Sequence, residues 1–148
     1  MVDVKHNDKL VIRGSLNLII YSRGLITNDY ILGPSLGSGS VQSVREAIHI
    51  KSQIKRAVKC VKKIDNDENK FLNEIEVMSK LSHPNLMQII EIYDDSKNFY
   101  IVSELCSGGE LFDKIIERGI FTEKEAADII RQILSVLIYT HQNNIQHL

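Results

Sequence analysis

The sequence predicts an α+β fold in which five strands carry one inserted helix and two further helices follow. Apolar and polar side chains alternate with a period of two over residues 30–63 and again over 86–105, which is typical of half-buried strands. Between these regions, apolar side chains recur at helical spacing, and a helix-capping pattern begins at residue 122. Because the strands are segregated from the last two helices, the order favours α+β.

The first three predicted strands form an antiparallel meander. The stretch "YILGPSLGSG" at 30–39 runs into a glycine turn, and "SVREAIHI" at 43–50 is its hairpin partner. The stretch "IKRAVKCVKK" at 54–63 is the third strand. Its alternation places one set of side chains (Ala57, Lys59 and Val61) on one face and another (Val58 and Cys60) on the opposite face.

A helix follows the third strand. Asp65 or Asp67 can cap its start, and Pro84 ends it because proline disfavours helical backbone at the preceding residue. Two more strands, "LMQIIEIYD" and "NFYIVSEL", are joined by the polar turn "DDSKN". The apolar side chains of the helix are Phe71, Ile75, Met78 and Leu81.

Two helices complete the predicted fold. The pair Gly108-Gly109 opens a short helix that runs to about Glu117. A capping box at Thr122–Glu125 begins a long helix that runs to about His141. Residues 1–28, which mix short apolar bursts with glycine and charge, are expected to form a lead-in or an added edge strand.

The composition excludes several classes of function. The chain carries 18 basic and 19 acidic residues, so no nucleic-acid partner is expected. No apolar run reaches the roughly 18 residues that span a bilayer, and without a targeting signal the expected location is the cytoplasm. Cys60 and Cys106 match no metal or redox spacing and are expected to be reduced thiols, and no metal site is predicted.

Three features suggest a phosphate-binding site. Gly37 and Gly39 lie in a loop between two strands, where backbone amides can face phosphates, although an ordinary hairpin turn is the alternative. A third glycine would fall at position 42, where the chain has Gln42, whose β-carbon is expected to restrict the hairpin tip and weaken nucleotide binding. Lys59 lies in mid-strand, and Glu74 lies on the apolar stripe of the helix. A carboxylate facing a sheet needs a cation, so a Lys59–Glu74 pair is expected; the alternative is that Glu74 bends out to water.

These stretches together resemble the N-terminal part of a eukaryotic protein kinase domain, most closely a calcium-dependent or calmodulin-dependent Ser/Thr kinase. The resemblance covers about residues 29–148. It implies an N-terminal extension at 1–28, an N-lobe at about 29–105, a hinge at about 104–108 and the first helices of a C-lobe at about 109–142. The matching stretches are "YILGPSLGSGSVQSV", "RAVKCVKK", "FLNEIEVMSKLSHPNLMQIIEIYDD", "FYIVSELCSGGELFDKIIERGIFTEKEAADIIRQIL" and "IYTHQNNIQH".

The resemblance implies roles for individual residues. Lys59 would contact the α- and β-phosphates of ATP and pair with Glu74. Ser103 would be the gatekeeper behind the adenine, Glu104 and Cys106 would offer hinge backbone hydrogen bonds, and Glu110 would lie near the ribose. The implied ATP-binding residues are Leu36, Gly37, Ser38, Gly39, Ser40, Val44, Ala57, Lys59, Ser103, Glu104, Cys106 and Glu110.

The resemblance also implies an activity: transfer of the ATP γ-phosphate to protein Ser/Thr, with Mg²⁺ in the complete kinase. The family's catalytic aspartate lies beyond Leu148, so the isolated chain is expected to transfer no phosphate. A pseudokinase scaffold with weakened nucleotide binding is one alternative, and a small interaction domain without nucleotide is another. The apolar stripe of the last helix is expected to drive self-association of the isolated chain; its residues are Ile129, Ile130, Ile133, Leu134 and Leu137.

Overall fold

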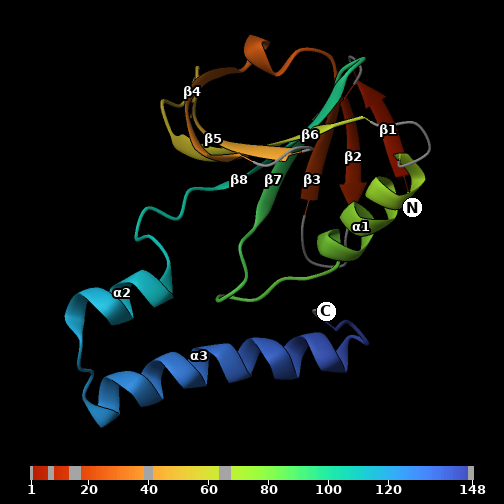
Figure 1. Ribbon diagram of the computed structural model, residues 1–148. Helices are drawn as coiled ribbons and strands as arrows, with labels where there is room; N and C mark the ends of the chain where they lie inside the picture. The colour runs from red at the N-terminus through yellow and green to blue at the C-terminus, as the bar shows by residue number, and fades with distance from the viewer. Residues whose placement is uncertain (1, 7–8, 14–17, 39–41, 64–67, 147–148) are drawn as a thin grey trace. The chain divides into compact units, whose positions relative to one another are not determined.

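A computed structural model describes the backbone of residues 2–6, 9–13, 18–38, 42–63 and 68–146. The chain forms two compact units. Residues 1–82 and 87–105 make up the first unit, and residues 83–86 and 106–148 make up the second. The first unit is a sheet with one helix, and the second is helical (Figure 1).

In the described part of the chain, the sheet of the first unit contains eight strands in the order β1-β2-β3-β7-β8-β6-β5-β4. The five predicted strands are all present as β4 to β8, and the meander of β4, β5 and β6 is antiparallel, as predicted. The elements are β1 (Val2–His6), β2 (Lys9–Arg13), β3 (Leu18–Arg23), the 3₁₀ turn η1 (Ile26–Asn28), β4 (Tyr30–Ser38), β5 (Gln42–His49), β6 (Lys55–Lys62), α1 (Glu68–Ser79), β7 (Ile89–Asp94) and β8 (Asn98–Glu104).

The lead-in contributes three strands rather than at most one edge strand. β1, β2 and β3 are antiparallel neighbours, and β3 pairs in parallel with β7. The other strand pairs of the described sheet are antiparallel. The sequence did not predict this extension, because the parallel partner of β3 lies about 70 residues further along the chain and leaves no local signal.

Each face of the sheet has its own hydrophobic core. On one face, α1 packs through Phe71 and Ile75, which form a buried cluster with strand residues that include Val61. On the opposite face, Val58 is fully buried and Cys60 packs beside it. The two faces of β6 therefore divide as the period-two alternation predicts.

The second unit contains α2 (Leu111–Arg118) and α3 (Glu123–Gln142). The predicted capping box is confirmed: Thr122 Oγ1 accepts from the Glu125 amide at 3.3 Å, and the Glu125 carboxylate accepts from the Thr122 amide at 2.9 Å. Gly119 follows α2 with a φ of 72°, a left-handed backbone that glycine adopts without strain. Among the described helices, none combines the length and apolar character needed to cross a bilayer.

Candidate functional site

The predicted site residues of the first unit are aligned across three central strands. Val44 on β5 pairs with Lys59 on β6, and Lys59 pairs with Ile101 on β8. Two residues along β6, Ala57 pairs with Ser103. Directly paired residues of antiparallel strands share a face of the sheet, so all five side chains project from the same side.

The glycine-containing hairpin borders this face. Gly37 on β4 pairs with Val44, and Leu36 beside it is 53% exposed. A β-carbon built on Gly37 would meet no heavy atom of the described residues within 4 Å. The backbone at Gly37 is therefore open to close approach by a ligand, which is the use that glycine serves in phosphate-binding loops.

Gln42, where a third glycine was considered, lies at the start of β5 in regular register with Val61. The described non-glycine residues with positive φ are Gln53 and Asn144, so the backbone at Gln42 is outside the left-handed region. A β-carbon at this position therefore carries no conformational cost. The side chain is exposed, and its effect on nucleotide affinity stays a prediction.

Lys59 lies two residues along β6 from a residue that packs against the α1 cluster. Its neighbour on the same face, Val61, packs against the cluster that contains Phe71 of α1. The helix also carries Glu74, whose side chain lies outside the described residues, so the Lys59–Glu74 pair stays a prediction. Glu76, predicted to lie on the solvent side, is exposed and forms an ion pair with Lys80 at 2.9 Å.

The end of β8 is held by a reciprocal pair of contacts. The Gln88 amide donates to Glu104 Oε1 at 3.1 Å, and the Glu104 amide donates to the Gln88 carbonyl at 3.3 Å. Ser103 is 5% exposed, and its hydroxyl donates to the Glu104 carbonyl at 3.3 Å. Ser103 and Ala57 are thus two small side chains paired on the same face of the sheet.

The remaining predicted residues are placed less completely. The side chain of Ser38, and all of Gly39 and Ser40, lie outside the described residues. Cys106 and Glu110 belong to the second unit, where both are exposed. The hinge backbone hydrogen bonds of Cys106 and the place of Glu110 near the ribose therefore stay predictions.

Two groups that pack in the core on the face opposite Lys59, Cys60 and Tyr93, have raised pKa values. Burial raises the pKa of the Cys60 thiol, which lies on the face opposite Lys59, so the thiol remains protonated at neutral pH. Burial, followed by its contact with Asp29, raises the pKa of Tyr93. Its hydroxyl lies 2.8 Å from Asp29 Oδ2 and 3.0 Å from Glu91 Oε2. Cys60 and Cys106 are both free cysteines.

The second unit contains an open apolar groove with a volume of about 570 Å³. Its polar rim is organised by Asn85, whose Nδ2 donates to Gln132 Oε1 at 3.0 Å. Much of α3 is exposed, including Leu134 at 51%. Self-association through this helix stays a prediction. The groove is lined by Asn85, Leu86, Leu111, Ile129, Gln132, Ile133, Val136, Leu137 and Thr140.

Comparison with known proteins identifies several sequence relatives of this chain. A probable myosin light chain kinase of Dictyostelium discoideum is 41% identical over 82% of the chain. A calcium/calmodulin-dependent protein kinase type 1 of Macrobrachium nipponense is 40% identical over 82% of the chain, and calcium-dependent protein kinase 5 of Plasmodium falciparum is 45% identical over 76%. The chain spans 32%, 36% and 20% of the lengths of these three relatives.

The fold and the family model agree with these relatives. The solved structure of a twitchin kinase fragment from C. elegans superposes with a TM-score of 0.80 and 28% identity, over 88% of this chain and 30% of that one. The family model for the protein kinase domain matches residues 30–148. That match starts at the first residue of β4 and includes every described site residue. The chain belongs to the protein kinase domain family.

Proposed function

We propose that the chain supplies the ATP-binding part of a calcium-regulated serine/threonine protein kinase, which transfers the γ-phosphate of ATP to protein hydroxyl groups. The observation that carries the proposal is the register that aligns Gly37, Val44 and Lys59 on neighbouring strands. Calcium control is supported by relatives whose names include calcium or calmodulin dependence. The substrate would be a protein in the complete kinase.

The aligned residues fit the chemistry of phosphoryl transfer. Protein kinase domains in general use ATP with Mg²⁺, and the metal, when bound, neutralises phosphate charge. Lys59 provides an ammonium group that can bind phosphate oxygens, and the open backbone at Gly37 can approach them. Ala57 is small enough to leave room for a flat base between the hairpin and β8. Glu74 is proposed to hold Lys59 in place.

Titration with a fluorescent ATP analogue tests nucleotide binding. We expect Lys59→Ala to raise the Kd by at least about tenfold, because it removes a charge-assisted contact to phosphate. Lys62→Ala is the matched control, since Lys62 is an exposed lysine on the opposite face of the same strand. The titration uses the full-length natural protein that contains these 148 residues. Equal Kd values for the two variants would contradict the assignment.

The same titration, combined with an assay of phosphoryl transfer to a peptide, separates the alternatives. Nucleotide binding together with phosphoryl transfer supports the kinase. Binding without transfer in the full-length natural protein would instead favour a pseudokinase scaffold. The absence of any binding would favour an interaction domain without nucleotide.

The buried Ser103 gives a separate prediction for inhibitors. We expect adenine analogues with bulky substituents to bind the wild type, and Ser103→Met to weaken them by about tenfold or more by filling the space behind the base. Unsubstituted ATP analogues are the control and should change by less than about twofold, since they do not enter that space. Competition against the fluorescent analogue measures both affinities. Unchanged affinity of the bulky analogues for Ser103→Met would contradict the gatekeeper role of Ser103.

A further inference from the structure

The N-terminal extension shares a hydrophobic core with α1. Ile19 and Tyr21 on β3 are 1% and 8% exposed and belong to the same buried cluster as Phe71 and Ile75 of α1. Tyr21 is brought there by the parallel pairing of β3 with β7, in which it pairs with Ile92. Residues that precede the matched kinase domain therefore form part of the surface on which α1 rests.

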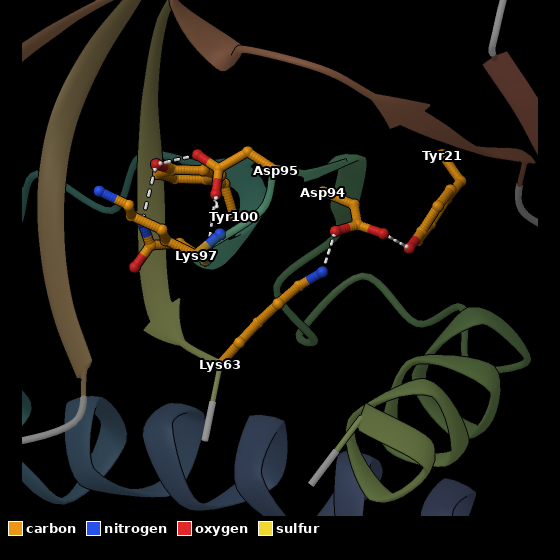
Figure 2. Close-up of polar contacts among 7 residues, drawn as sticks. Tyr21, Lys63, Asp94, Asp95, Lys97 and Tyr100 are labelled. Atoms are coloured by element: carbon orange, nitrogen blue, oxygen red, sulfur yellow. Dashed lines mark hydrogen bonds and ion pairs between the residues drawn. The ribbon is translucent and has the colours of Figure 1, made fainter. Parts of the chain in front are cut away.

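A polar network fixes Tyr21 at this position. The Tyr21 hydroxyl donates to Asp94 Oδ2 at 2.6 Å, and Lys63 Nζ forms an ion pair with Asp94 Oδ1 (Figure 2). The side chain of Asp94 is only 10% exposed and that of Lys63 is 26% exposed. Because charge-assisted hydrogen bonds are strong when shielded from water, the network resists separation of β3 from β7.

The network continues to α1 through two aromatic rings. Lys63 Nζ lies 4.4 Å from the centroid of the Phe99 ring, which is within the range of a cation–π contact. Phe99 stacks on Phe71 of α1 with 4.1 Å between ring centroids and 13° between ring planes. A continuous series of contacts thus joins β3 to the helix.

The far end of β3 is anchored as well. The Gly24 amide donates to the Asp94 carbonyl at 2.9 Å. The C-terminal end of β3 is therefore tied to the end of β7 by main-chain and side-chain bonds, which oppose a slip in register.

We infer that β3 is a positioning element for α1, in which Tyr21 and Asp94 are positioning residues for the kinase reaction. The inference rests on the proposed function, because α1 carries Glu74, the proposed partner of Lys59. With β3 docked, α1 is held against the sheet. When the bonds of Tyr21 are lost, α1 gains freedom and Lys59 loses its fixed partner. The extension thus controls the phosphate site without touching nucleotide.

Hydrogen exchange on the 148-residue chain tests the coupling. We expect Tyr21→Phe, which keeps the ring and removes the hydroxyl, to accelerate exchange of the α1 amides by about tenfold. Tyr21→Ala should accelerate it further. Arg23→Ala is the matched control on the same strand, since Arg23 is exposed, and it should leave α1 unchanged. Unchanged exchange in α1 for Tyr21→Phe, or equal acceleration in α1 and in the β4–β5 hairpin, would overturn the inference.

Steady-state kinetics of the full-length natural protein, with kcat and KM for ATP as the measured quantities, give a second readout. We expect Tyr21→Phe to lower kcat about tenfold while KM for ATP changes less than about twofold, because the variant loosens an arrangement needed in the transition state. A lower melting temperature with wild-type kcat would show a purely structural role and contradict the inference. If the wild type binds no nucleotide, the proposed function fails, while the exchange experiment still decides whether β3 holds α1.

Discussion

Lys59→Met is expected to lower the rate of peptide phosphorylation at least about 100-fold when it is made in the full-length natural protein that contains this chain. In the proposed function, the Lys59 side chain supplies the positive charge that stabilises phosphate oxygens during transfer, and removing such a group typically costs about 10²–10³ in rate. Methionine keeps most of the apolar length of lysine, so the substitution removes the charge with little change in packing. Initial rates at saturating ATP measure the effect.

Lys62→Met controls for a general loss of positive charge on β6. Lys62 is exposed and pairs with Asn98, away from the face that carries Ala57 and Lys59. Its activity should remain within about twofold of wild type, and both variants should melt within a few degrees of it, as is usual for surface changes. Full activity of Lys59→Met would show that Lys59 takes no part in phosphoryl transfer.

Phe71→Ala is expected to lower the free energy of unfolding by about 3–5 kcal/mol, the usual cost of truncating a buried phenylalanine. Phe71 is 9% exposed and stacks on Phe99, so its removal opens a cavity between α1 and the sheet. This is a large part of the roughly 5–15 kcal/mol that stabilises a typical domain. Urea denaturation followed by circular dichroism at 222 nm gives the change, since the chain contains no tryptophan.

Val77→Ala is the matched control on the same helix. Val77 is 40% exposed, and alanine has the higher helix propensity, so the free energy of unfolding should change by less than about 0.5 kcal/mol. Equal destabilisation by the two variants would show that α1 is not held through Phe71. A loss of stability in Phe71→Ala alone would support the packing of Phe71 between α1 and the sheet. The proposed coupling of α1 to β3 depends on the same packing.

Much of the site was predictable because its information is local. Alternation with a period of two placed Ala57 and Lys59 on one face of a strand, and the register of β5, β6 and β8 agrees with that placement. The capping box at Thr122 was predictable for the same reason, since it depends on residues three apart. The kinase resemblance then implied roles that geometry alone could not give to Ser103 or Glu104.

Gln42 shows that the position of a residue in a sequence motif does not reveal whether its backbone needs the freedom of glycine. A non-glycine residue was expected to restrict the hairpin, on the assumption that the position needs glycine backbone freedom. The structure places Gln42 in a regular strand with φ outside the left-handed region. Only the backbone conformation, which the sequence pattern did not reveal, decides whether a glycine is needed.

The sequence by itself determined the strands β4 to β8, the three helices and the faces of β6, because hydrophobic period and capping act between residues close in the chain. Only the tertiary structure decided that β3 lies parallel to β7 and that the Tyr21 hydroxyl donates to the Asp94 carboxylate. Such pairings join segments about 70 residues apart. Their free energy comes from burial and hydrogen bonds that exist only after the chain has folded.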